Sequence, residues 1–230
     1  MIPSCMHACG PLICGVALPQ ETVIVLLSMT PEQASMLTDE PAEENGEMQL
    51  DRDSVWLERQ WMMKRILLHP DLGKPCQPNQ VINVQHSNKL MFVCKLLEES
   101  VPHDIKVLII STCSSSLLLM EFVCQKLHIG YVKIDGSVPA GDRIPLVAIF
   151  NDPSSTAKVC LLSSQAGGVG LNLTGASRVV MLDSSWNPAT DMQAMARVSR
   201  YGQRNKVVIY RLLVRGSVDV EIFLAQVGIS

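Results

Sequence analysis

Short apolar runs alternate with helical segments from residue 87 to the end of the chain, and this alternation limits the fold more than any other feature. The apolar runs predict strands at 107–110, 131–134, 159–162, 178–182 and 207–213. The other segments predict helices at 88–99, 117–127, 142–150, 188–200 and 218–225. Buried strands that alternate with helices form a parallel sheet covered on both faces. We therefore expect an α/β fold of three layers, α/β/α, with a mostly parallel sheet.

The first 86 residues have a different pattern and predict a partly helical extension. They contain one good strand at 21–27, a helix that starts near Thr30 and Pro31, and a helical segment at 56–68. An acidic stretch at 39–54 and a stretch with glycine and prolines at 71–86 are typical of loops and linkers. We predict two regions, an extension over 1–86 and an α/β domain over 87–230.

Composition and charge exclude some classes of protein. The 230 residues are 47% apolar, which is enough for a buried core. The formal net charge of −3 gives no overall basic field, and the six basic residues over 191–215 are by charge alone a solvated face. Because no apolar run approaches the ~18 residues of a membrane span, we expect no membrane partner.

The eight cysteines do not indicate a disulfide framework. Four of them lie inside apolar runs, where a thiol behaves as a small hydrophobe: Cys94, Cys113, Cys124 and Cys160. Residues 5–14 contain three further cysteines and His7, but their spacing matches no common zinc site. We predict reduced thiols in an intracellular protein and no metal site.

A glycine-rich segment follows the predicted strand at 159–162, and residues 163–172 read SSQAGGVGLN. Glycines after a strand let a phosphate approach the backbone closely. A dinucleotide fingerprint would need a glycine in place of Leu173, so the Rossmann interpretation fails. The residues alone leave a tight turn and a phosphate site equally open. A phosphate-binding loop of the form GxxxxGK[ST] does not occur in the sequence.

Arg197 and Arg200 lie three apart on the helix predicted at 188–200, with Gln193 one turn earlier on the same side. Two guanidinium groups on one face suit bidentate contact with phosphate, and arginines stabilise charge in phosphoryl transfer. A solvated basic face is the alternative. Trp186 follows a predicted strand and precedes a helix start, so a core tryptophan is an equally open interpretation.

Taken in order, these segments resemble the C-terminal helicase lobe of the switch/sucrose-nonfermenting (SWI/SNF) family of helicase-like ATPases. The resemblance covers about residues 87–226 and rests on the motifs SNKL, VLIIS, KIDGS, SSQAGGVGLNL, DSSWNPATDMQA, QAMARVSRYGQ and VVIYRLLVRGSVDVEIF. The wording of WNPATDMQAMARV and IYRLL is most similar to the recombinational-repair translocase branch. The earlier segments LPQETVIVLLSMTPEQ and MMKRILLHPDL resemble the passage after the first lobe, so we expect the chain to begin past that lobe.

The resemblance implies a RecA-like second lobe of an ATP-driven double-stranded-DNA translocase in the nucleus. ATP with magnesium would be held mainly by an ATP-binding RecA-like lobe, in cis or in trans. Duplex DNA or chromatin would be the substrate, and recombination proteins would be further partners. The resemblance implies arginine fingers at Arg197 and Arg200, and ATP-site roles for Gln193, Gly170 and Asn172. The residues implied on the DNA side are Ser111, Thr112, Ser163, Gly167, Gly168 and Trp186.

The sequence also departs from the family pattern. Cys113 stands where the family often has glutamine, and Ser199 where histidine or tryptophan is common. Neither departure removes a charged phosphate ligand, but both fit a copy that is losing its activity. Because the sequence has no nucleotide-binding loop, a DNA- or partner-binding module without catalysis is the second interpretation. An RNA helicase lobe is disfavoured, because WNPATDMQA belongs to the DNA translocase pattern.

Overall fold

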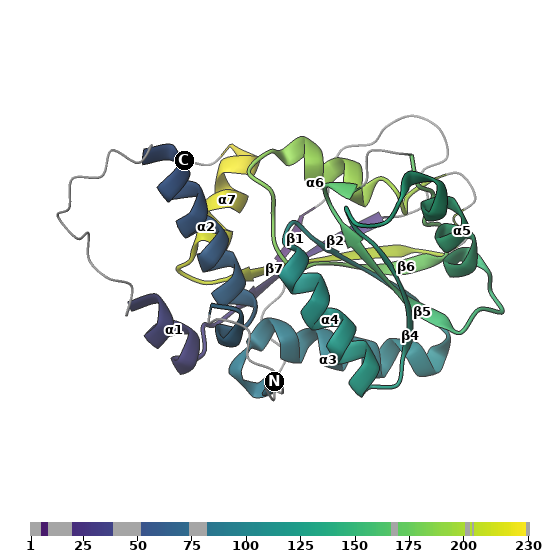
Figure 1. The fold of residues 1–230 in the computed structure, drawn as a ribbon, viewed down its shortest axis with the longest axis horizontal. Coiled ribbons are helices and arrows are strands. Elements are labelled where there is room, and N and C mark those ends of the chain that lie inside the picture. Colours follow the sequence, from purple (N-terminus) through teal and green to yellow (C-terminus); the bar gives the residue numbers. More distant parts are fainter. Residues whose placement is uncertain are drawn as a thin grey trace.

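The computed structural model describes residues 6–8, 20–38, 52–73, 82–166, 170–200, 203 and 205–228 (Figure 1). The strands are β1 (Met6–Ala8), β2 (Gln20–Leu27), β3 (Lys106–Ser111), β4 (Gly130–Ile134), β5 (Ala157–Ser163), β6 (Ala176–Met181) and β7 (Val207–Val214). The α-helices are α1 (Pro31–Thr38), α2 (Arg52–Leu68), α3 (Asn88–Ser100), α4 (Ser114–Lys126), α5 (Ala140–Asn151), α6 (Pro188–Met195) and α7 (Val218–Val227). Short 3₁₀ helices lie at Pro70–Gly73, Val84–His86 and Val101–His103.

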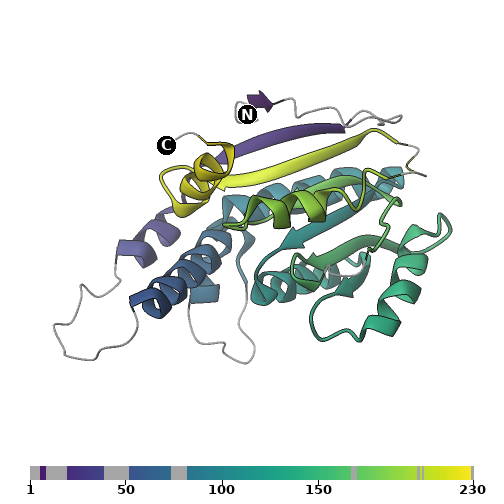
Figure 2. The same ribbon diagram turned by 90° about the horizontal axis from the view of Figure 1, so that it is seen from above.

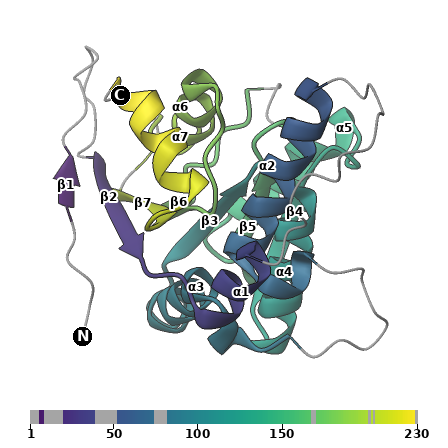
Figure 3. The same cartoon turned by 90° about the vertical axis from the view of Figure 1, so that its left-hand side faces the viewer.

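In the described residues the strands form one seven-stranded sheet in the order β1-β2-β7-β6-β3-β5-β4. Every pair from β2 to β4 is parallel, and β1 pairs with β2 in the antiparallel sense. β1 and β2 therefore lie at one edge of the sheet (Figure 3). The predicted α/β fold with a mostly parallel sheet is confirmed.

Hydrophobic side chains cover both faces of this sheet, and β3 shows why. Val107 and Ile109 enter the core under α3 and α4, whereas Leu108 and Ile110 enter the core under α5 and α6. Successive side chains of a strand point to opposite faces, so a strand that is apolar throughout is buried on both. Figure 1 shows α3 and α4 on one side of the sheet and α6 and α7 on the other.

The predicted extension contributes to the same sheet. β2 pairs with β7 along its whole length, from Gln20 opposite Val207 to Leu27 opposite Val214 (Figure 2). Side chains of β2 share a core with Leu90 of α3. The division after residue 86 stays a prediction, but the regions on its two sides share one sheet and one core.

Most helices and strands lie within a few residues of the ranges predicted from the sequence. The helix predicted at 188–200 is an exception, because α6 ends at Met195. The next amide groups bond to carbonyl groups three residues back, from Arg197 to Ala194 at 3.3 Å. The carbonyl oxygen of Arg197 then accepts a hydrogen bond from the N–H of Leu173, at 2.9 Å, and this tertiary contact replaces a further helical turn.

Within the described residues, none of the helices combines the length and the apolar character that a membrane crossing needs. The three cysteines in 5–14, at positions 5, 9 and 14, lie outside the described residues.

Candidate functional site

Two of the residues predicted on the DNA side are neighbours at the end of the sheet. Ser111 ends β3 and Ser163 ends β5, and the two residues pair in the parallel register. The N–H of Ser164 donates to the carbonyl oxygen of Ser111 at 3.0 Å. Because parallel strands end at the same edge, the loops that follow β3 and β5 begin side by side.

The carboxylate of Asp183 joins β6 to the end of β3. It accepts hydrogen bonds from the hydroxyl of Ser111 and from the N–H and hydroxyl of Thr112, the last two at 2.8 and 2.5 Å. Asp183 is 5% exposed, so these bonds replace the water that a carboxylate needs. Ser111 and Thr112 therefore lie at the carboxyl edge of the sheet, and their hydroxyls orient an acidic side chain.

Residues 182–187 follow β6, and we name them the β6 loop. Lys89 of α3 donates to the carbonyl oxygen of Leu182 at 2.7 Å, and its ammonium lies 2.7 Å from the carboxylate of Asp219 on α7. Lys64 of α2 donates to the carbonyl oxygen of Ser184 at 2.6 Å. Two helices, α2 and α3, thus hold Leu182 and Ser184 of one loop with buried ammonium groups, and α7 supplies the carboxylate that pairs with one of them.

A second polar group holds the far side of the β6 loop. The guanidinium of Arg211 on β7 contacts the hydroxyl of Ser184 at 3.0 Å and the carboxylate of Asp191 at 3.1 Å. That carboxylate also accepts from the N–H of Ser185 at 3.1 Å and from the side-chain amide of Gln226 at 2.9 Å. Burial raises the pKa of Asp191, and these partners oppose the rise.

Trp186 lies on the surface of the β6 loop with 41% of its area exposed. Its ring lies 5.5 Å from that of Trp56 on α2, with a tilt of 43° between the rings, and Trp56 is 47% exposed. The alternative of a core tryptophan is therefore wrong. The two rings form one exposed aromatic surface, to which the extension contributes Trp56 and the α/β domain contributes Trp186.

Arg197 and Arg200 lie beside the end of the glycine-rich segment. The guanidinium of Arg200 donates to the carbonyl oxygen of Gly170 at 3.4 Å and to that of Ala196 at 3.1 Å, and Arg200 is exposed. Arg197 is 6% exposed. Burial, followed by the positive charge of Arg200, lowers the pKa of Arg197. An anion placed between these two groups would relieve that repulsion.

The other predicted residues have simpler surroundings. Gln193 is exposed on α6. Because α6 ends at Met195, Gln193 does not share a continuous helix with Arg197 and Arg200. Asn172 is exposed, and its carbonyl oxygen accepts a hydrogen bond from the side chain of Asn151 at 2.7 Å. Gly167 and Gly168 lie outside the described residues. Among the described residues, no group of three or more His, Cys, Asp or Glu is placed to hold a metal ion.

A known family model matches the sequence of the α/β domain. The model is the helicase conserved C-terminal domain, and it matches residues 88–202, which is half of the chain. The chain belongs to this helicase C-terminal family. The matched residues begin at α3 and include the β6 loop and both arginines.

The curated relatives are DNA repair and recombination proteins, in agreement with the resemblance found in the motifs. The chain is 42% identical over 148 residues to the human DNA repair and recombination protein RAD54B, covering 63% of this chain and 16% of that protein. It is 37% identical over 160 residues to the DNA repair and recombination protein RAD54 of Saccharomyces cerevisiae, covering 69% and 18%. The chain thus spans about a fifth or less of these relatives.

Solved structures share the fold of this helicase domain. The C-terminal part of the Fun30 ATPase domain superposes with a TM-score of 0.71 at 22% identity, covering 91% of this chain and 90% of that one. The SWI2/SNF2 ATPase core domain of Sulfolobus solfataricus superposes with a TM-score of 0.67 at 24% identity, covering 90% and 42%. The matched share is larger than residues 87–230 alone, so the shared fold includes part of the extension.

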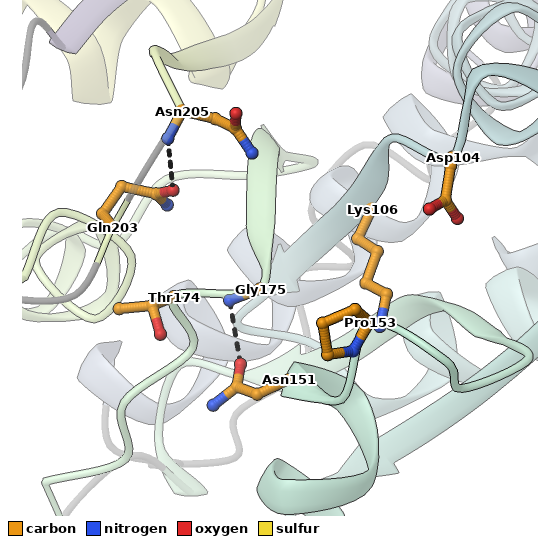
Figure 4. A pocket seen from close by; sticks show the side chains of 8 residues that line it. All are labelled: Asp104, Lys106, Asn151, Pro153, Thr174, Gly175, Gln203 and Asn205. Carbon is orange, nitrogen blue, oxygen red and sulfur yellow. Dashed lines mark hydrogen bonds between the residues drawn. The ribbon is translucent and has the colours of Figure 1, made fainter.

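A cavity of about 360 Å³ in the helicase domain lies away from these groups (Figure 4). Its lining residues are Asp104, Lys106, Asn151, Pro153, Thr174, Gly175, Gln203 and Asn205. Several of these residues precede or begin a strand, so the cavity lies at the amino ends of the sheet. Its polar groups bond to one another, as the N–H of Gly175 does to the side chain of Asn151 at 2.9 Å. The cavity is therefore a polar hollow between the loops that precede the strands.

Sequence patterns missed the buried charges that hold the β6 loop: Lys64, Lys89, Asp183, Asp191 and Arg211. One signal was present for Arg211, which stands inside the apolar run VVIYRLLV. A charge within a strand that is otherwise apolar predicts a buried partner. The partners themselves come from distant segments and leave no local pattern.

Proposed function

We propose that this chain is the second motor lobe of an ATP-dependent double-stranded-DNA translocase of the recombinational-repair type. The observation that carries the proposal is the contact of Arg200 with Gly170 and the charge interaction of Arg200 with Arg197, within the residues that the helicase family model matches. Two positively charged guanidinium groups that repel each other are suited to phosphate that is supplied by a second lobe.

On the ATP side, ATP with magnesium would be held mainly by an ATP-binding RecA-like lobe, and its hydrolysis supplies the energy for movement. Arg200 is exposed and would reach the phosphates across the gap between the lobes. Arg197 is nearly buried and would give a fixed positive charge behind it. Gln193, Gly170 and Asn172 would line the same side of the ATP site. Both arginines would stabilise the negative charge that develops on the phosphates during hydrolysis.

On the DNA side, Ser111, Thr112 and Ser163 would contact the sugar-phosphate backbone together with Gly167 and Gly168. The hydroxyls of Ser111 and Thr112 and the N–H of Thr112 donate to Asp183, so these donors would turn from that carboxylate to the phosphates when the strand binds. Trp186 would pack against the DNA where the β6 loop meets it. Contacts to the backbone predict binding with little sequence preference and strong dependence on salt. Such a motor works in the nucleus.

The test is to mix the chain with the purified ATP-binding lobe of a relative and to measure ATP hydrolysis with and without duplex DNA. We expect hydrolysis that depends on DNA and on both proteins, and none from the chain alone. Arg200→Ala should lower the rate by ~10³-fold, as loss of an arginine finger does. Arg178→Ala is the matched control, because the hydrogen bonds of the Arg178 side chain within the described part of the chain go to the carbonyl oxygens of Ser177 on β6 and Lys206 just before β7.

Two results would contradict the proposal. One is that the mixture shows no ATP hydrolysis stimulated by DNA. The other is that the Arg200→Ala variant hydrolyses ATP as fast as the Arg178→Ala variant. If the chain binds duplex DNA but never supports hydrolysis, the second interpretation holds, namely a DNA-binding module without catalysis.

A further inference from the structure

We propose that α2 is a working part of the DNA-coupling site, and that Lys64 is the positioning residue through which it holds the β6 loop and Trp186. This inference rests on the proposed function, because it assigns to the β6 loop a role in contact with DNA. It adds to that function a residue of the extension, at a position outside the residues that the helicase family model matches.

Lys64 is an unusual residue to bury. It is 6% exposed, yet the acceptor of its ammonium is a neutral carbonyl oxygen, that of Ser184 at 2.6 Å. The ring of Trp61 lies 5.6 Å away and adds a weaker attraction to the positive charge. Burial of an ammonium without a carboxylate is costly, and an apolar side chain of the same length would fill the space at less cost. The ammonium therefore indicates a need to fix the backbone of the β6 loop at Ser184.

The contact between Trp56 and Trp186 lies on the same two segments. Both rings are almost half exposed, so their contact buries little area and contributes little to overall stability. The contact instead sets the direction in which Trp186 projects. Lys64 fixes the backbone two residues before Trp186, and Trp56 limits the ring itself.

The other contacts of the β6 loop come from within the α/β domain. Lys89 holds Leu182, and Arg211 and Asp191 hold Ser184 and Ser185. Lys64 and Trp56 contact the β6 loop from α2. The helix α2 follows α1 in the chain and precedes α3. A shift of α2 would therefore move Trp186 while the sheet stays in place.

The first experiment observes the loop in the full chain without DNA or ATP. The chain is labelled with 5-fluorotryptophan, and the fluorine resonances of its three tryptophans are assigned with Trp→Phe variants. Lys64→Met should move the Trp186 resonance toward its position in the unfolded chain, and Lys64→Arg should restore it. Lys95→Met is the matched control, because Lys95 is 70% exposed on α3 and lies 4.0 Å from Glu99.

The second experiment measures binding of duplex DNA over a range of salt concentrations. Lys64→Met should weaken binding by about tenfold, the effect of losing one buried charged hydrogen bond. The slope of log K against log salt should stay unchanged, because a positioning residue neutralises no phosphate. A direct phosphate contact would instead reduce that slope by about one.

An unchanged Trp186 resonance in Lys64→Met overturns the inference, and so does a reduced salt slope. If Lys64→Met does not fold, Trp56→Leu must move the same resonance, or the inference fails. If the wild-type chain does not bind duplex DNA, the proposed function fails, while the fluorine spectra still decide whether Lys64 positions the loop.

Discussion

Removal of the buried ammonium of Lys89 should destabilise the fold more than removal of the ammonium of Lys64 or Lys95. Lys89 and Asp219 are each 1% exposed, and their charged atoms lie 2.7 Å apart. The ammonium also donates to the carbonyl oxygen of Leu182 at 2.7 Å. Lys89→Met keeps the length of the side chain and removes both contacts.

The expected size follows from what remains. In this variant Oδ2 of Asp219, the oxygen that contacts Lys89, still accepts a hydrogen bond from the N–H of Val214 at 3.2 Å. Its other oxygen, Oδ1, has no hydrogen-bond partner among the described residues. A carboxylate left buried without its cation costs about 3–5 kcal/mol. For a chain of this size that loss lowers the melting temperature by roughly 6–20 °C. The variant Lys89→Met with Asp219→Leu removes the stranded charge and should recover about 2 kcal/mol.

Urea unfolding followed by circular dichroism measures these differences, provided that the m-value stays constant. Lys95→Met is the control and should change the free energy of unfolding by less than about 0.5 kcal/mol, since Lys95 is 70% exposed. The reasoning is refuted if Lys89→Met costs less than about 1 kcal/mol, or if the double variant is as unstable as the sum of its two single variants.

Two further predictions concern packing and thiol chemistry. Gly130→Ala should cost about 1–3 kcal/mol in urea unfolding, because a Cβ there would lie 2.4 Å from the carbonyl oxygen of Thr156, whereas Gly141→Ala meets nothing within 4 Å and should not destabilise. Burial raises the pKa of Cys94, with help from Glu98, to about 11 and that of Cys124 to about 12, from an ordinary 9.0. A raised pKa lowers the thiolate fraction at pH 8 by about 100-fold and 1000-fold, so iodoacetamide should label both thiols slowly in the native chain and quickly after unfolding, with the native rate increasing as the pH rises. Rapid native labelling at pH 8, read by mass spectrometry, would contradict the burial of these thiols.

Local periodicity was enough to predict the layers of this fold. The run VLII at 107–110 is apolar at every position, as expected for a strand buried on both faces. These residues lie in β3, which is buried along its whole length. The motif spacing was equally informative for the family, because the residues around Trp186 and the two arginines keep their order and separation along the chain. Both kinds of information are short in range and can therefore be read from neighbouring residues.

The sequence by itself thus determined the α/β architecture, the family and the residue types available for phosphate and DNA. Tertiary structure alone decided that residues 20–27 extend the sheet beside β7, and that the segment with Arg197 leaves the helix to bond with Leu173. It also brought Lys64, Lys89 and Arg211 to one loop from α2, α3 and β7. The physical reason is that a buried charge is satisfied by whichever group is near in space, and the cost of its burial does not depend on separation along the chain.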